Sequence, residues 1–129
     1  MKRIETEEAP KALGPYSQGV KGSKQKELLF VSGQLPLDAK SGKFVEGDIQ
    51  TLTKQVIKNL EAILHAGGSD LQHVLRTDVF MTDLNQFKAM NEEYARHFTG
   101  PTFPARQTIQ VAMLPLGAEI EISCIAEVK

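Results

Sequence analysis

The sequence predicts an α+β fold, and three observations support this class. The predicted elements follow the order strands, helix, strand, helix, strands. Two segments place apolar residues every three or four positions, which indicates helices with one apolar face. Two such helices can cover one face of a mixed five- or six-stranded sheet, but not both. The 129 residues suffice for one core, so we expect a single domain over residues 1–129.

The predicted strands begin before the first helix. Residues 2–6 and 16–22 are weak candidates, whereas residues 28–32 form a short apolar run after a charged turn. The first helix is expected over residues 48–65, because Asp48 is a suitable N-cap and two glycines follow the segment.

The second half of the chain alternates strand, helix and strands. Residues 74–82 and 108–113 are apolar and rich in β-branched side chains, which is typical of strands. A second helix is expected over residues 84–98, and Pro101 closes that region. This helix is expected to bury one stripe of apolar side chains: Leu84, Phe87, Met90, Tyr94 and Phe98.

The last strand has the clearest alternation of side chains. Its apolar side consists of Ile120, Ile122, Cys124, Ala126 and Val128, and its polar side of Glu119, Glu121, Ser123, Ile125 and Glu127. The polar side carries Ile125, joined by Phe30 or Val31 from an earlier strand, so this face is neither plainly wet nor plainly core. We therefore expect it to be buried against other copies of the chain, in a closed dimer or trimer.

Composition excludes several classes of protein. The net charge is −1 and no Lys/Arg cluster exceeds two adjacent residues, so nothing indicates binding of nucleic acid or an anionic membrane. This weakens a nuclease interpretation without excluding it. No apolar run approaches the roughly 20 residues that span a bilayer, and the first residues lack a hydrophobic signal core. With a single cysteine, no internal disulfide can form, and we expect a cytoplasmic location.

No metal site is expected. His65, His73 and His97 lack the spacing of metal ligands, and the zinc, phosphate-loop and dinucleotide motifs are absent. Cys124 belongs to the apolar side of its strand, which favours a buried, inert thiol.

Tyr16 and the pair Ser32–Gly33 are the first candidates for a binding site. Two glycines and a proline fix a tight path that exposes Tyr16, an aromatic residue with a polar tip. A turn with a packed tyrosine explains the same residues and is favoured on these grounds alone. Gly33 permits close approach of a ligand or of another chain, but an ordinary structural glycine is favoured on these grounds alone.

Arg106 is the strongest candidate. It lies between a proline-stiffened loop and a strand, and its planar guanidinium offers two parallel N–H groups that match a carboxylate. The competing explanation is an ordinary ion pair with Glu119 or Glu121. Glu121 lies on the polar side of its strand, where it could orient a water molecule or simply be solvated.

An ordered set of motifs resembles one known family over essentially the whole chain. The motifs are GPYSQG, VSGQLPLD, QVIKNLEAIL, VFMTDLNQFKAMNEEYARHF, FPARQT and LPLGAEIEI. In this order they resemble the RidA/YjgF imine deaminase family. The resemblance implies a chorismate-mutase-like fold, a homotrimer with clefts between subunits, and no cofactor. It also implies hydrolysis of 2-aminoacrylate, 2-iminopropanoate and 2-iminobutanoate to 2-oxo acids and ammonia.

The resemblance also assigns roles to residues. Arg106 matches the arginine that holds the substrate carboxylate, and Glu121 the glutamate that positions or activates water. The backbone at Thr108 is expected to face the imino nitrogen or the water. Three matches line the cleft, Tyr16, Ser32 and Gly33, and Asn91 matches a further polar position.

One departure affects Thr108 itself. Many family members carry a cysteine at this position, two residues after the arginine, so any thiol-dependent activity is in doubt. Imine hydrolysis needs no thiol. Leu116–Gly117 also departs from the charged residues common there, which is expected to affect a turn more than the chemistry.

Three other functions remain open from the sequence. A regulator could bind a small carboxylate at the same site without turnover, since fold does not determine function. A chorismate mutase needs several cations for its dicarboxylate, and only Arg106 is placed in the cleft. An RNA-directed activity needs a basic groove that the composition does not provide.

Overall fold

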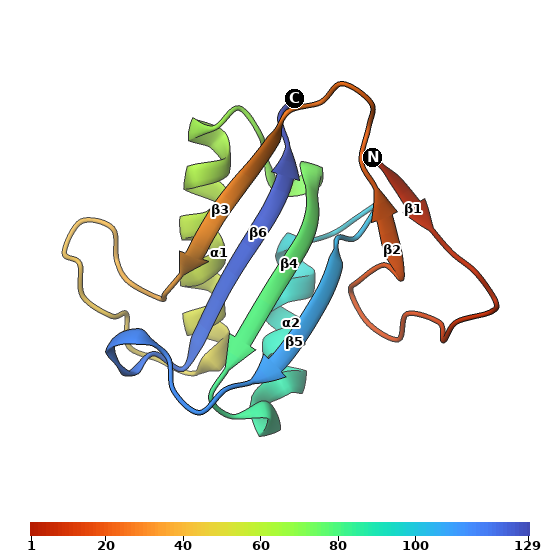
Figure 1. Cartoon of the computed structure of the whole chain (residues 1–129). Helices are drawn as coiled ribbons and strands as arrows, with labels where there is room; N and C mark the ends of the chain where they lie inside the picture. The colour runs from red at the N-terminus through yellow and green to blue at the C-terminus, as the bar shows by residue number, and fades with distance from the viewer.

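The computed structural model describes residues 1–129 and places two helices on one face of a four-stranded sheet (Figure 1). The predicted α+β class, with a mixed sheet and helices on one face, is confirmed. The strands β4 and β5 run parallel, whereas β6 is antiparallel to both of its neighbours. The strand order is β3 (Leu28–Gln34), β6 (Ile120–Glu127), β4 (Val74–Met81) and β5 (Ala105–Gln110).

The prediction of one five- or six-stranded sheet is wrong. The strands β1 (Lys2–Ile4) and β2 (Gly19–Lys21) form a separate two-stranded sheet. A single bridge between Ser17 and Ala105 connects the segment before β2 to the edge of β5, where the Ser17 amide donates to the Pro104 carbonyl at 3.1 Å. Proline has no amide hydrogen, so this ladder cannot extend backwards past Ala105.

The first helix, α1 (Ile49–Ala66), begins and ends as the sequence predicts. The Asp48 carboxylate caps it by accepting a hydrogen bond from the Thr51 amide at 2.9 Å, and Gly67 follows its last turn. One stripe of this helix is buried against the sheet and includes Leu52, Val56, Ile57, Leu60 and Leu64.

The second helix, α2 (Phe87–His97), begins three residues later than expected. The Asp83 side chain instead caps a short 3-10 turn, Leu84–Gln86, so the first turn of the predicted helix has a different form. Met90, Tyr94 and Phe98 are buried as predicted.

Two side chains of the predicted stripe on α2 are not buried. Leu84 and Phe87 are 36% and 37% exposed. Leu84 lies on the preceding turn, and Phe87 borders the guanidinium of Arg106 beside the edge strand β5 instead of entering the core.

The strand β5 is shifted relative to the prediction of residues 108–113. It pairs with β4 from Arg76–Ala105 to Met81–Gln110. β5 ends at Gln110 because its parallel partner β4 ends at Met81. The β-branched residues alone could not indicate this end.

The two faces of the sheet differ. Val31 and Cys124 face the helices and are almost fully buried, and burial raises the pKa of the Cys124 thiol to about 12. The predicted buried thiol therefore fits the structure. On the opposite face Phe30 is 70% exposed and lies beside its cross-strand partner Ile125, with Leu28 also exposed. None of the helices is long and apolar enough to cross a membrane.

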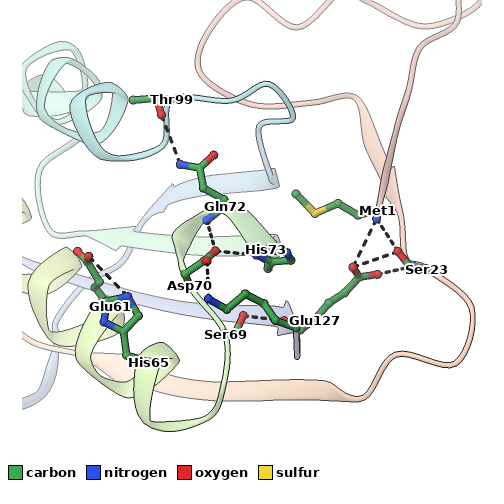
Figure 2. A network of polar contacts seen from close by, with 11 residues as sticks. Met1, Ser23, Glu61, His65, Ser69, Asp70, Gln72, His73, Thr99 and Glu127 are labelled. Atoms are coloured by element: carbon green, nitrogen blue, oxygen red, sulfur yellow. Dashed lines mark hydrogen bonds and ion pairs between the residues drawn. The ribbon is translucent and has the colours of Figure 1, made fainter.

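Glu127, predicted on the polar side of the last strand, is only 2% exposed within the single chain. Figure 2 shows its carboxylate between Ser23 and the N-terminal ammonium of Met1. The Ser23 amide and hydroxyl donate to it, and the ammonium lies 3.4 Å from Oε2. Burial opposes ionisation here, but these hydrogen bonds and the positive charge outweigh it and lower the pKa of Glu127. The contacts tie the end of β6 to the N-terminal segment.

Replacing Glu127 with glutamine is expected to reduce stability and its dependence on pH. A depressed folded pKa contributes stability above the unfolded value of about 4.3, and this contribution is lost as the pH falls through the folded pKa. At pH 7 we expect a loss of about 1–2 kcal/mol for Glu127→Gln. Thermal unfolding between pH 3 and 7 measures this, and parallel curves for both proteins would contradict it.

Candidate active site

Arg106 lies near the start of β5 in a niche formed with α2 and the segment before β2. Its Nη1 donates a hydrogen bond of 2.6 Å to Oδ1 of Asn91. Three aromatic rings surround the guanidinium, with ring centroids 4.8 Å (Tyr94), 5.5 Å (Tyr16) and 5.7 Å (Phe87) from its Cζ atom. The niche is therefore aromatic and polar, and it lies on the helix side of the sheet.

Arg106 makes no ion pair within the chain. The alternative of an ordinary pair with Glu119 or Glu121 is therefore wrong. The side chain is partly buried, and desolvation lowers the pKa of the guanidinium from its ordinary value. A partly buried cation without an anion has lost water contacts that no carboxylate replaces. Its unpaired N–H groups can donate hydrogen bonds to the two oxygens of a ligand carboxylate.

Tyr16 borders this niche, with its ring beside the Arg106 guanidinium. Its hydroxyl accepts a hydrogen bond from the Leu13 amide at 3.3 Å, which holds the ring within the preceding loop. The residue also lines a cavity of about 610 Å³ enclosed by the N-terminal loop, together with Gly14 and Phe103. Arg106 does not line that cavity, whose charged lining residues belong to the exposed N-terminal segment, so we place the candidate site at Arg106 instead.

Thr108 lies two residues after Arg106 and therefore on the same side of β5. Its Oγ1 atom is buried and has no hydrogen-bond partner within the chain. A buried hydroxyl without a partner costs about 1–3 kcal/mol relative to a paired one. The family resemblance assigns a role to the backbone at Thr108, whereas the structure shows a side-chain hydroxyl that lacks a partner.

Glu121 lies on the opposite face of the sheet from Arg106. Its neighbours Ile120 and Ile122 are fully buried against the helices, so alternation directs Glu121 to the open face. There it lies over Gly33 of β3: a Cβ atom at Gly33 would come within 2.8 Å of the Glu121 Cδ atom. The chain thus brings Glu121 and Gly33 together, with Ser32 next to them, and keeps them apart from Arg106.

Replacing Gly33 with alanine is expected to displace the Glu121 side chain. The added methyl would also come within 3.0 Å of Cγ, so the whole side chain must move off the backbone of β3. We expect the crystal structure of Gly33→Ala to show a different Glu121 rotamer and turnover to fall by about tenfold. Gly19→Ala on β2 is the control, since a Cβ atom there would meet only the Ile4 side chain at an ordinary 3.6 Å. An unchanged rotamer would contradict this expectation.

The predicted site residues thus form two groups in one chain. Arg106, Tyr16 and Thr108 lie on the helix side, and Asn91 contacts Arg106 there. Sequence reasoning missed the part played by Phe87 and Tyr94. Their spacing of four and three residues around Asn91 on one helix stripe was visible, but it indicated only core packing.

The histidines have structural partners and no metal geometry. His73 and His97 each lie 2.7 Å from a carboxylate oxygen, of Asp70 and Glu93 respectively. No group of three His, Cys, Asp or Glu side chains is arranged to hold a metal ion.

Comparison with known proteins identifies the family. The family described as Endoribonuclease L-PSP matches residues 6–128. The chain belongs to this family. The resemblance to RidA/YjgF proteins is confirmed, because relatives in this family carry those names.

Two relatives and one solved structure illustrate the similarity. The chain is 50% identical to "Reactive Intermediate Deaminase A, chloroplastic" of Arabidopsis thaliana, over 95% of this chain and 64% of that protein. It is 44% identical to the "2-iminobutanoate/2-iminopropanoate deaminase" of Mus musculus, over 97% and 90%. Among solved structures, E. coli TdcF with bound serine has 37% identity, full coverage of both chains and a TM-score of 0.74. The two relatives are named as deaminases, and the TdcF chain shares the fold over its whole length.

Proposed function

We propose that this protein is a hydrolytic deaminase of small enamine and imine acids. Its substrates are 2-aminoacrylate, 2-iminopropanoate and 2-iminobutanoate, and its products are 2-oxo acids and ammonia. The observation that carries the proposal is the partly buried Arg106, which has no carboxylate partner of its own. The names of the Arabidopsis and mouse relatives support it. The serine bound in the TdcF structure is an amino acid that also carries a carboxylate.

The reaction requires few catalytic groups from the protein. The enamine tautomerises to the imine, water attacks the imine carbon, and the C=N electron pair moves to nitrogen, which takes a proton. In the resulting carbinolamine the hydroxyl proton passes to the nitrogen, the C–N bond breaks, and ammonia leaves as the C=O bond forms. In this scheme Arg106 holds the carboxylate and Glu121 orients the water and takes its proton. None of these steps needs a thiol or a cofactor.

We further propose that the active cleft lies between subunits of a trimer with a chorismate-mutase-like arrangement. Arg106 and Glu121 lie on opposite faces of one sheet, so one small substrate cannot reach both within a single chain. The open face is apolar at Leu28 and Phe30, which favours its burial against another copy. A neighbouring copy can then present Glu121, Gly33 and Ser32 to Arg106. The cytoplasmic location expected from the sequence stays a prediction.

Trapping of the imine tests the function directly. A pyridoxal-phosphate-dependent threonine dehydratase generates 2-iminobutanoate, and semicarbazide converts this imine to a semicarbazone that is followed by absorbance. The protein is expected to lower the initial rate of semicarbazone formation by competing for the imine, because 2-oxobutanoate reacts with semicarbazide more slowly than the imine does. A binding regulator would bind 2-oxobutanoate but leave the initial rate unchanged, which would exclude the proposed activity.

Replacing Thr108 with valine is expected to weaken substrate binding. Its unpartnered hydroxyl can bond to the bound substrate, and valine keeps the shape while removing that group. We expect KM for 2-iminobutanoate to rise by about fivefold, while thermal stability is maintained or increased, since no bond within the chain is lost. A destabilised variant with unchanged KM would mean that the hydroxyl serves the fold.

A further inference from the structure

We propose that Tyr94 is a positioning residue, whose ring face holds the Arg106 guanidinium in the orientation that binds a carboxylate. The ring centroid of Tyr94 lies 4.8 Å from Cζ of Arg106, closer than the two other rings around it. Tyr94 is fully buried, whereas Phe87 is 37% exposed. The guanidinium therefore rests on a desolvated ring, where the attraction between a cation and an aromatic face is strongest.

The Tyr94 ring is itself fixed on two sides. Its hydroxyl shares a hydrogen bond of 2.8 Å with Oγ1 of Thr77, which is also fully buried. One face stacks on Phe98, with ring centroids 4.4 Å apart and planes inclined by 22°. The ring thus has little freedom to follow a moving guanidinium.

The register of the sheet links this ring to Arg106 a second time. Thr77 on β4 is the direct neighbour of Arg106 on β5 in the parallel ladder. The hydroxyl of Tyr94 is therefore tied to the residue beside the arginine whose guanidinium its ring supports. Helix α2 and strand β5 are held in one relative position through Thr77, Tyr94 and Arg106.

Asn91 fixes a different part of the guanidinium. It lies one turn before Tyr94 on α2, and its Oδ1 accepts the 2.6 Å bond from Nη1 of Arg106. Asn91 holds one edge of the planar group and Tyr94 supports its face. The remaining N–H groups have no partner within the chain and stay available for a carboxylate. Burial raises the pKa of the Tyr94 hydroxyl, so the ring stays a neutral phenol near pH 7.

This role matters because a bidentate contact depends on orientation. A free arginine side chain loses rotamer entropy when it binds, and a misaligned fork loses one of its two hydrogen bonds. The positioning role of Tyr94 rests on the proposed carboxylate-binding function of Arg106. It adds a residue that contacts no substrate but sets how tightly the substrate is held.

A matched pair of double variants isolates the ring. Tyr94→Phe with Thr77→Val keeps the ring and removes both hydroxyls, so neither is left unpaired in the core. Tyr94→Leu with Thr77→Val removes the ring as well. Titration calorimetry with 2-oxobutanoate is expected to show a Kd within about threefold of wild type for the first variant, and about tenfold weaker for the second. An equal Kd for both folded variants would overturn the role of the ring.

Ring electronics provide a test that does not depend on the leucine variant folding. Phenylalanines with increasing numbers of fluorines, placed at position 94 in the Thr77→Val background, keep the shape but weaken the negative ring face. The Kd for 2-oxobutanoate is expected to rise with each fluorination step, and by less than twofold in total when Arg106 is also alanine. A Kd that is independent of fluorination would overturn the proposal.

Failure of the positioning role is distinguishable from failure of the deaminase function. The Nε–Hε resonance of Arg106 in NMR reports the order of the guanidinium without any ligand. It is expected to be sharp in the wild type and in the Tyr94→Phe double variant, and to broaden in the leucine variant. If the wild type neither turns over imine nor binds 2-oxobutanoate, the proposed function fails, and the NMR result alone decides on Tyr94.

Discussion

Replacing Arg106 with alanine is expected to lower kcat/KM for 2-iminobutanoate by about 100-fold or more. The variant loses two charge-assisted hydrogen bonds to the carboxylate, together worth about 3 kcal/mol in the transition state. No other cation contacts the niche, since the neighbours of Arg106 are the amide of Asn91 and three aromatic rings. Semicarbazone competition measures the loss.

Replacing Arg106 with lysine separates charge from geometry. A lysine keeps the positive charge but not the planar fork, and it cannot both reach Asn91 and offer two parallel donors. We expect a loss of about tenfold in kcat/KM, which is about 1.4 kcal/mol. Circular dichroism and thermal unfolding serve as controls, because Arg106 pairs with no acid whose charge the substitution would leave unbalanced. Unchanged turnover by the alanine variant would remove Arg106 from the site.

Local sequence signals predicted most of the fold because they act over short distances. The cap at Asp48 and the apolar stripe of α1 fixed that helix closely. The alternation of the last strand likewise placed Ile120 and Ile122 in the core. Pairing between distant segments has no such local signal. β1 and β2 form a second sheet because only a single bridge, at Ala105, joins the segment before β2 to β5. The end of β5 depends on its partner β4.

In the candidate site, too, local sequence signals indicate residues, whereas their relative positions depend on contacts between distant segments. Family motifs predict roles for Arg106 and Glu121, but their positions on opposite faces of the sheet follow from tertiary structure. The buried Glu127 was assigned to the polar side of its strand, since alternation cannot anticipate that Met1 and Ser23 cover it. Tyr94 was predicted as core, and it is core. Its second contact, with Arg106, becomes visible only when α2 is placed beside β5.

Glutamine at position 121 is expected to lower kcat by about 100-fold or more, because an amide cannot accept the proton of the attacking water. Mixing this variant with Arg106→Ala is then expected to restore activity. If each cleft takes Arg106 from one subunit and Glu121 from its neighbour, about one third of the clefts in trimers that contain both chains carry both native residues. Such trimers are obtained by coexpressing the two chains with different tags and purifying on both tags in turn.

The control for this experiment pairs two variants from the same side of the cleft. Gly33 and Glu121 lie together on the open face of one chain, so Gly33→Ala mixed with Glu121→Gln leaves no cleft fully native and is expected to gain little. Restoration by the first mixture and not by the second would place the two groups on different subunits. If the first mixture is no more active than the mean of its components, the cleft is not shared in this way. Arg106 would then act with groups of its own chain, and Thr108, whose buried hydroxyl has no partner, is the first of these to examine.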